Sequence, residues 1–156
     1  KIKIPAGVDD GSQIRYAGKG QAGEKGAPAG DLYITINVTP HEYFERQGSD
    51  LFYTAETNFP LLALGGEIEI PTLAEPKKLQ IPAGTQNGKV FRLTGEGIVK
   101  LRGGRGNLHI KVQAVTPEEI APEESKLLKQ LKEYYAKNPP KKTKNFWRNF
   151  KENFKF

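Results

Sequence analysis

Apolar and polar residues alternate in several short stretches of the chain, which is the pattern of β-strands with one buried face. In the clearest stretch, residues 32–38, every second side chain is aliphatic. Similar stretches occur at residues 1–4, 13–16, 51–59, 67–70, 79–81, 90–93 and 108–114. Glycine and proline, which interrupt strands, stand between them. The pattern predicts a mainly β protein built from small antiparallel sandwiches.

One part of the sequence occurs twice, with an offset of 77 residues. Lys1–Gly20 returns as Lys78–Gly97, so that the Ile-Pro-Ala-Gly at residues 4–7 matches the one at residues 81–84. The similarity resumes with an offset that is one residue shorter, so that Gly30–Ile34 matches Gly106–Ile110. A β-bulge inside a strand is expected to absorb the odd residue. Fixed-period similarity with two copies predicts two related β-units in tandem, the first of them incomplete.

The composition changes at Pro117. Apolar residues then recur at helical spacing until Asn138-Pro139-Pro140 stops them, which predicts a C-terminal helical segment. A basic linker at residues 141–144 leads to a second short aromatic stripe. The sandwich cannot easily cover all of this apolar surface, so a partner is expected. The residues concerned are Leu127, Leu128, Leu131, Tyr134, Tyr135, Phe146, Trp147 and Phe150.

The length and composition of the chain limit the class of protein to which it can belong. The 156 residues are 37% apolar, enough for a core, and no apolar run approaches the ~20 residues of a membrane span. There is no cysteine, hence no disulfide or thiolate metal site, which fits a reducing, cytoplasmic compartment. No methionine is present and the chain opens inside an expected strand, so it is interpreted as a fragment of a longer protein.

Four segments together resemble the C-terminal half of bacterial DnaJ-type J-domain co-chaperones. They are Ile4–Gly11, the loop ending in Gly30–Tyr33, Leu64–Leu73 and Ile81–Lys89, all in the order of that family. The tail from Lys144 resembles the family's dimerisation segment more loosely. The family's J-domain, with its His-Pro-Asp motif, is absent. No cofactor is expected in this chain; in zinc-bearing members, zinc belongs to a cysteine-rich module upstream in the parent protein.

The resemblance implies a division of the chain and a function. Residues 1–40 would be the latter part of client-binding β-domain I, residues 41–116 client-binding β-domain II, and residues 117–156 a helical segment that closes a homodimer. The family catches unfolded polypeptide and passes it to the ATP-driven chaperone DnaK. An extended client would add as a strand to a sheet edge, with an apolar pocket taking a large side chain.

The resemblance and the repeat also suggest which residues touch the client. Ile34 matches a pocket position in the first domain, and the repeat maps it onto Ile110 in the second. The facing strands of the second domain would add Tyr53, Ala55, Ile68 and Ile70. The alternative for each is that an alternating aliphatic side chain simply belongs to the core. Likewise, the tail has the alternative of folding back on its own sandwich.

Other functions find less support in the sequence. With two histidines and no thiol, nothing suggests an enzyme. The net charge of +6 and the Arg-Gly-Gly at residues 102–104 raise single-stranded nucleic acid as the alternative partner. However, that segment occupies the same place as the glycine-rich loop of the first copy, which favours a hairpin loop. A basic aromatic tail lying on a membrane surface is less favoured still.

Overall fold

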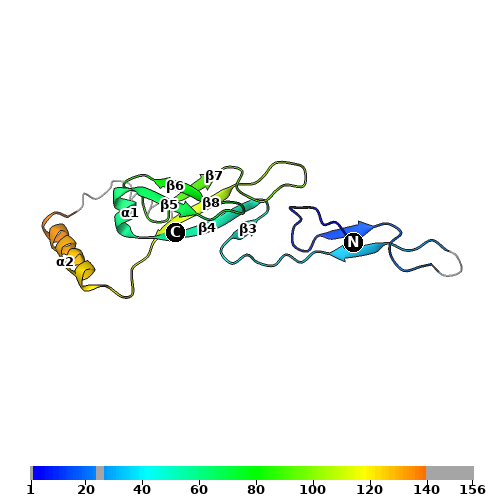
Figure 1. The fold of residues 1–156 in the computed structure, drawn as a ribbon, viewed down its shortest axis with the longest axis horizontal. Coiled ribbons are helices and arrows are strands. Elements are labelled where there is room, and N and C mark those ends of the chain that lie inside the picture. The colour runs from blue at the N-terminus through cyan, green and yellow to red at the C-terminus, as the bar shows by residue number, and fades with distance from the viewer. Residues whose placement is uncertain (1, 24–26, 140–156) are drawn as a thin grey trace, which may run out of the picture. The chain divides into compact units, whose positions relative to one another are not determined.

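The computed structural model describes residues 2–23 and 27–139, and the chain divides into two compact units, Lys1–Thr116 and Pro117–Phe156. In chain order, the described elements are β1 (Gln13–Tyr16), β2 (Leu32–Thr35), β3 (Glu45–Gln47), β4 (Asp50–Thr57), α1 (Phe59–Leu64), β5 (Gly66–Ile70), β6 (Lys77–Ile81), β7 (Val90–Leu93), β8 (Leu108–Ala114) and α2 (Pro122–Lys137) (Figure 1). No helix in this described part of the chain is long and apolar enough to cross a membrane.

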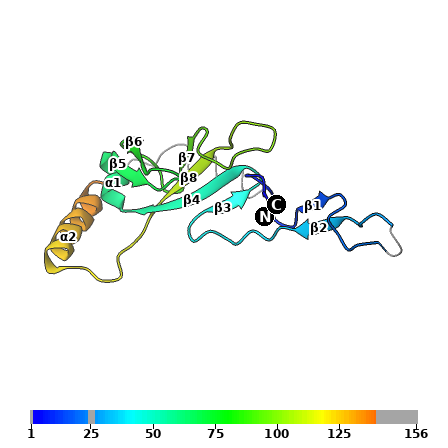
Figure 2. The same ribbon diagram turned by 45° about the vertical axis from the view of Figure 1, so that its right-hand side comes forward.

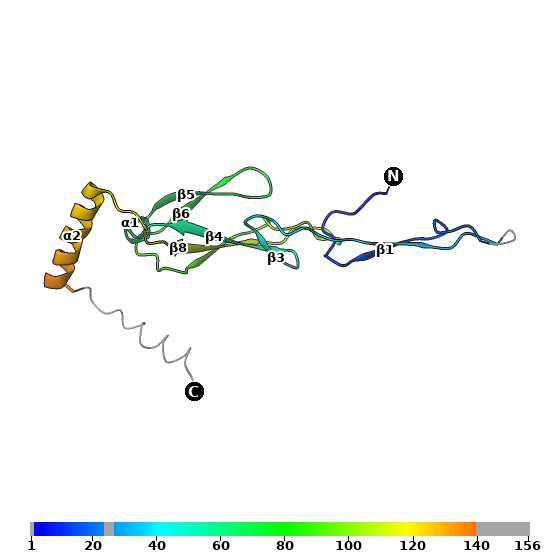
Figure 3. The same cartoon turned by 90° about the horizontal axis from the view of Figure 1, so that it is seen from below.

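The strands of the first unit form three sheets. β1 pairs with β2, β5 pairs with β6, and the largest sheet has the order β3-β4-β8-β7. Viewed from below, the β5–β6 hairpin forms a layer beside the sheet that contains β4 and β8 (Figure 3). The mainly β fold with a C-terminal helix is therefore confirmed.

One strand pair differs from the all-antiparallel expectation. β4 and β8 run parallel, with Tyr53 opposite Ile110 and Ala55 opposite Val112. Parallel neighbours need a long crossover connection. Here α1 and the β5–β6 hairpin, followed by β7, supply that connection. Alternation within a strand does not reveal the direction of its neighbour, which explains the difference.

The core lies between the β5–β6 hairpin and the larger sheet. In β8, Leu108, Ile110 and Val112 have no exposed surface, while His109 and Lys111 between them face the other side. Each such burial contributes ~1.5–3 kcal/mol. The buried cluster consists of Phe44, Leu51, Ala55, Leu62, Ile70, Leu79, Ile81, Leu108, Ile110 and Val112.

The two copies of the repeat form equivalent hairpins. Gln13 of β1 lies opposite Thr35 of β2, and the corresponding Val90 of β7 lies opposite Lys111 of β8. Figure 2 shows β1 and β2 as a short hairpin from which the glycine-rich loop runs on. The two copies therefore share the same strand pairing and register.

The odd residue of the repeat lies in a loop and not in a strand. Gly20 donates its N–H to the carbonyl of Gly30 at 2.7 Å, and Gly97 donates to Gly106 at 3.0 Å. Equivalent hydrogen bonds thus close both loops. In the first copy, the extra residue lies in the loop between Gly20 and Gly30. The β-bulge interpretation was wrong, because a surface loop accepts an added residue without disturbing the strand pairing.

The strand expected at residues 1–4 is also absent. Residues 2–4 belong to no strand, whereas their counterparts at residues 79–81 lie in β6. The physical reason is pairing: β6 is hydrogen-bonded to β5, and no described strand pairs with residues 2–4. Without a neighbouring strand, residues 2–4 form no ladder of main-chain hydrogen bonds, and the carbonyl of Lys3 accepts a bond from the Tyr16 hydroxyl at 3.1 Å.

Both described helices have local signals at their ends. Asn58 precedes α1, and its Oδ1 accepts a hydrogen bond from the N–H of Leu61 at 2.9 Å. α2 opens with Pro122 and carries Glu123 and Glu124 in its first turn, which favours the helix dipole. The prediction of a helix after Pro117 is confirmed. The second stripe, with Phe146, Trp147 and Phe150, lies outside the described residues.

Candidate functional site

Three of the residues expected to contact a client lie in the core. Ile70 and Ile110 have no exposed surface, and Ala55 is 4% exposed. All three belong to the single buried cluster of the second half of the unit. A polypeptide arriving from solvent does not touch them in this conformation, so their contribution is to support the surface above them.

Tyr53 and Ile68 are more accessible. Both are only partly buried and pack against the same core. Ile68 lies on β5 opposite Leu79 of β6, and Tyr53 lies on β4 opposite Ile110. Ile34 lies apart from them in β2, where it is half-buried opposite Ile14. The structure therefore gathers Tyr53, Ile68 and the three buried residues around one core, and places Ile34 in a different sheet.

The β5–β6 hairpin has sheet edges with no neighbour among the described strands. It is a two-stranded sheet, so each strand is paired on one side only. The outer edge of β5 carries the alternating sequence Gly-Glu-Ile-Glu-Ile. Unpaired N–H and C=O groups along such an edge are a template for another extended chain.

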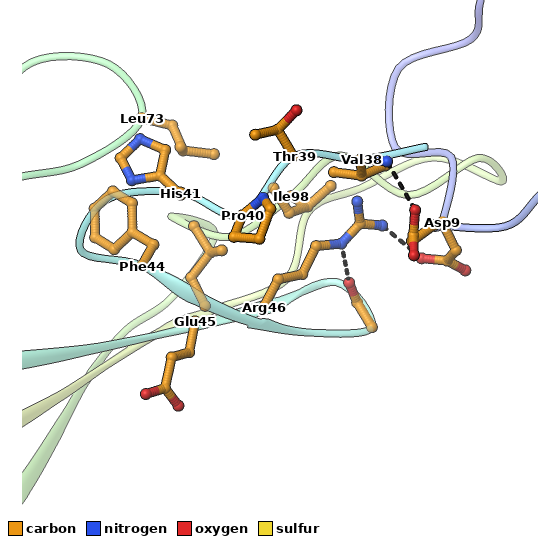
Figure 4. A pocket seen from close by; sticks show the side chains of 13 residues that line it. Asp9, Val38, Thr39, Pro40, His41, Phe44, Glu45, Arg46, Leu73 and Ile98 are labelled. Atoms are coloured by element: carbon orange, nitrogen blue, oxygen red, sulfur yellow. Dashed lines mark hydrogen bonds and ion pairs between the residues drawn. The ribbon is translucent and has the colours of Figure 1, made fainter. Parts of the chain in front are cut away.

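A cleft of about 880 Å³ includes Leu73 from the turn between β5 and β6 (Figure 4). Phe44, Leu73 and His41 lie together at one end of it in the close-up. Its floor includes Leu51 of the core and Ile98, which packs against the core. The lining consists of Asp9, Asp10, Val38, Thr39, Pro40, His41, Phe44, Glu45, Arg46, Gly48, Leu51, Leu73 and Ile98.

Aromatic rings connect the cleft to Tyr53. The ring centroid of Phe44 lies 5.9 Å from that of Tyr53 and 4.8 Å from that of Tyr43, both in edge-to-face arrangements. The ring centroid of His41 lies 5.0 Å from that of Phe44. Edge-to-face contacts of this kind hold aromatic side chains in place. The cleft wall is therefore a packed aromatic group, not a set of separate side chains.

Arg46 forms the polar wall of the cleft. Its Nη1 donates to the carbonyl of Val8 at 2.9 Å, one Nη2 bond goes to the carbonyl of Gly7 at 3.1 Å, and Nε donates to the carbonyl of Gly48 at 2.8 Å. Nη2 also pairs with Asp9 Oδ1 at 2.5 Å (Figure 4). A planar guanidinium that meets several acceptors at once fixes geometry well. Arg46 thus ties the segment at residues 7–9 to the β3–β4 turn.

Sequence reasoning missed this cleft. Its apolar side chains come from the connector before β3, from the turn between β5 and β6, and from the loop after β7. The available signal was the exposed apolar character of those connections: Leu73 is 45% exposed within a proline-flanked turn. Nothing in the spacing showed that the three connections meet.

The most perturbed acid of the described residues is Asp50, at the start of β4. Its pKa lies below the usual value, first because Asn107 donates its main-chain N–H to Oδ1 at 2.7 Å. His109 acts in the same direction, with Nε2 at 3.1 Å from Oδ2, and the charge of Lys100 adds to it. Phe52 stacks on the His109 ring at 4.8 Å. This group fastens β4 to β8 on the face away from the core.

No metal centre is present in the described part of the chain. Within residues 2–23 and 27–139, no group of three or more histidine and acidic side chains could hold a metal ion.

The residues expected to form a dimer are exposed where they are described. Leu127 is 66% and Tyr134 59% exposed, and α2 has no buried residue within its unit. Leu128 and Tyr135 are also exposed, and Leu131 is half-buried. The helix therefore presents apolar side chains that nothing in the described part of its own unit covers.

Comparisons with known proteins agree with the resemblance. The family model described as DnaJ C terminal domain matches residues 1–117. A chaperone protein DnaJ from Halalkalibacterium halodurans is 45% identical over 155 residues, which are 99% of this chain and 42% of the relative. A chaperone protein DnaJ from Shouchella clausii is 43% identical with the same coverage. The chain thus spans less than half the length of these relatives. It belongs to the DnaJ C-terminal domain family.

Proposed function

We propose that this chain binds unfolded or misfolded polypeptide as part of a longer co-chaperone. One observation carries the proposal: β5 is paired only with β6 among the described strands, and its partly exposed Ile68 stands over a packed core. An extended client can add to that edge through main-chain hydrogen bonds, which are common to all sequences. Such binding tolerates many clients because the backbone does not vary.

The cleft of Figure 4, which Leu73 of the β5–β6 turn helps to line, supports a side-chain pocket in the same domain. Phe44 and Leu73 offer an apolar wall, and Tyr53 joins it through the aromatic contact. A cleft that is mainly apolar with a few placed polar groups is typical of a binding site. The proposed contact residues of the second domain are therefore Tyr53 and Ile68, and the buried Ala55, Ile70 and Ile110 support them from beneath.

The rest of the proposal concerns the whole assembly. Residues 1–40 would contribute Ile34 to a first client-binding domain, residues 41–116 would form the second, and residues 117–156 would join two copies. Delivery of the client to DnaK would be a function of the full-length protein. The chain contains no His-Pro-Asp motif, so by itself it is not expected to stimulate the ATPase of that partner.

The test is a titration of the isotope-labelled chain with a permanently unfolded probe, reduced and carboxymethylated α-lactalbumin. We expect the amide signals of β5 and of Tyr53 to shift. Ile68→Asp should weaken binding about tenfold or more, because a large apolar contact is lost and a charge is introduced. Val90→Asp is the matched control, since Val90 is a 50% exposed aliphatic residue on an edge strand of the other sheet.

Folding is the control for the interpretation. Ile110→Asp should unfold the domain, since Ile110 has no exposed surface. If Ile68→Asp also unfolds it, Ile68→Thr keeps the strand propensity while removing apolar contact. Unchanged probe binding in a folded Ile68 variant, or equal losses in Ile68→Asp and Val90→Asp, would contradict a client site on β5.

A further inference from the structure

The connection between β7 and β8 is a second hairpin and not a loose loop. Gly106 donates its N–H to the carbonyl of Ile98 at 3.0 Å, and Lys100 donates to Gly104 at 3.0 Å. A bridge between Val99 and Arg105 completes the ladder. In Figure 1 the connection, drawn in yellow-green, continues beyond the ends of β7 and β8. We call residues 98–106 the tip hairpin.

The tip hairpin has a fixed shape. Gly103 and Gly104 have φ values of +91° and +80°, a region that L side chains rarely adopt, so the turn depends on them. At its base, Ile98 donates its N–H to the carbonyl of Ser49 at 2.8 Å. A Cβ added at Gly106 would overlap that same carbonyl. The tip hairpin therefore rests closely on the β3–β4 turn.

The side chains of the tip hairpin combine positive charge with one large apolar group. Lys100, Arg102 and Arg105 are exposed and form no ion pair with the described residues. Between the first two stands Leu101, with 65% of its surface exposed. Because the Leu101 side chain is exposed between two cationic residues, it does not contribute to the core.

The acids nearest the tip hairpin are already engaged. Asp9 pairs with Arg46 at 2.5 Å. Asp50 accepts the N–H of Asn107 at 2.7 Å and lies 3.1 Å from His109. Lys100 lies close enough to Asp50 to help lower its pKa, whereas Arg102 and Arg105 form no ion pair with the described residues, so positive charge remains in excess on this surface.

A shallow depression of about 290 Å³ lies at the base of the tip hairpin. Lys100, Leu101 and Arg102 form one side of it, and Arg46 with the β3–β4 turn forms the other. Because Arg46 is already paired with Asp9, a carboxylate bound here would meet Lys100 and Arg102, with an aliphatic group against Leu101. The lining consists of Gly7, Asp9, Arg46, Gly48, Ser49, Val99, Lys100, Leu101 and Arg102.

We propose that the tip hairpin is a docking surface for an acidic, extended polypeptide segment that carries an aliphatic side chain. The positive charge of the tip hairpin favours a partner with acidic side chains, because their charges are complementary. The exposed Leu101 favours a partner that also carries an aliphatic side chain. Single-stranded nucleic acid fits less well, because base binding depends on aromatic stacking and no aromatic side chain lines this depression. The surface is distinct from the β5 edge, so the proposal of acidic-peptide docking and the proposal of client binding are tested independently.

The test measures binding of the full chain to a fluorescent peptide of six glutamates around a single leucine. We expect salt-sensitive binding. The double variant Lys100→Glu/Arg102→Glu should bind about tenfold or more weakly, because two cations on one side of the depression become carboxylates that repel the peptide. Leu101→Ser should weaken binding about threefold or more through lost apolar contact. Lys89→Glu is the matched charge control, an exposed lysine beside the far end of β7.

Two further probes separate the alternatives. A peptide with glutamine in place of glutamate should not bind, and a single-stranded deoxythymidine decamer should bind more weakly than the acidic peptide. No binding of the acidic peptide, equal losses in Lys89→Glu and the double variant, or tighter binding of the decamer would overturn the proposal. Binding of unfolded α-lactalbumin should be unchanged in Leu101→Ser.

Discussion

Val38 donates its main-chain N–H to Oδ1 of Asp10 at 2.7 Å. In the second copy of the repeat, Ala114 donates in the same way to Oδ1 of Asn87 at 2.8 Å. Asp10 and Asn87 both stand just before a glycine of positive φ in the turn that leads into β1 or β7. In each copy, one short polar side chain in the turn before β1 or β7 therefore holds the chain at or just beyond the end of the partner strand, β2 or β8.

The first prediction concerns this bond. Asn87→Ala should lower the free energy of unfolding by about 1 kcal/mol, because the N–H of Ala114 loses its acceptor at a solvent-accessible position. Asn87→Asp retains a side-chain oxygen and should stay close to the original stability. Denaturant unfolding of the three proteins measures the difference. Equal losses in Asn87→Ala and Asn87→Asp would show that the carbonyl oxygen is not what matters.

The repeat was the most informative part of the sequence. It predicted two related β-units, and the structure shows equivalent hairpins in both because each copy carries its own turn glycines and its own Asp or Asn. These residues act within about thirty positions of each other, so the sequence order reflects the spatial order. The odd residue was wrongly assigned to a strand, although the match stops at Gly20 and resumes at Gly30, and the glycine-rich loop lies between those two residues.

The candidate site was only partly predictable. Alternation placed Ile68 and Ile70 on one strand but could not tell a partly exposed residue from a fully buried one, because that depends on the opposing layer. The cleft depends on Phe44, Leu73 and Ile98, which come from connections far apart in the chain. Long-range meetings of this kind leave no periodic signal.

The second prediction uses a matched pair of glycines from the repeat. Gly7 and Gly84 have φ values of +89° and +77°, but only at Gly7 would an added methyl group meet other atoms, because a Cβ there would overlap the carbonyl of Val99. No other atom lies within 4 Å of a Cβ added at Gly84. Gly84→Ala should therefore cost about 1–2 kcal/mol from backbone strain alone.

Gly7→Ala should disturb more than Gly84→Ala. The overlap with the Val99 carbonyl must be relieved by movement of residues 7–9, which Arg46 holds through the carbonyls of Gly7 and Val8. Amide exchange of the β3–β4 turn should then increase in Gly7→Ala and not in Gly84→Ala. Similar exchange in both variants would mean that the segment at residues 7–9 does not depend on this close approach.

The third prediction concerns acid stability. The folded-state pKa of Asp50 lies below its value of about 3.9 in an unfolded chain, chiefly through the N–H of Asn107. A depressed pKa contributes stability that is fully present above the unfolded value and is lost as the pH falls through the folded value. Asp50→Asn should therefore be less stable than the original chain at pH 7, by an amount that shrinks below about pH 4. Thermal unfolding from pH 7 to pH 2 tests this; a constant difference would contradict it.

The last prediction concerns the dimer. Leu127, Leu131 and Tyr134 follow one another at helical spacing on α2, and the described residues of its unit bury none of them. Burial of each large apolar side chain is worth ~1.5–3 kcal/mol, so several pairs across a two-fold axis can offset the cost of association. Two copies would also place two client sites on one particle, which raises the effective concentration for a long client.

Sedimentation equilibrium at micromolar concentrations decides between this dimer and a monomer whose tail folds back. The intact chain should have twice the monomer mass, and a chain stopped after Thr116 should have the monomer mass, because it lacks α2. Leu127→Ser/Leu131→Ser should weaken the dimer, since two apolar contacts per copy are lost, whereas Lys129→Ser, an exposed polar position on the same helix, should leave it intact. The double variant Trp147→Ala/Phe150→Ala tests whether the tail beyond the described residues also contributes to the dimer. A monomeric intact chain, or a shortened chain that remains dimeric, would show that α2 does not join the two copies.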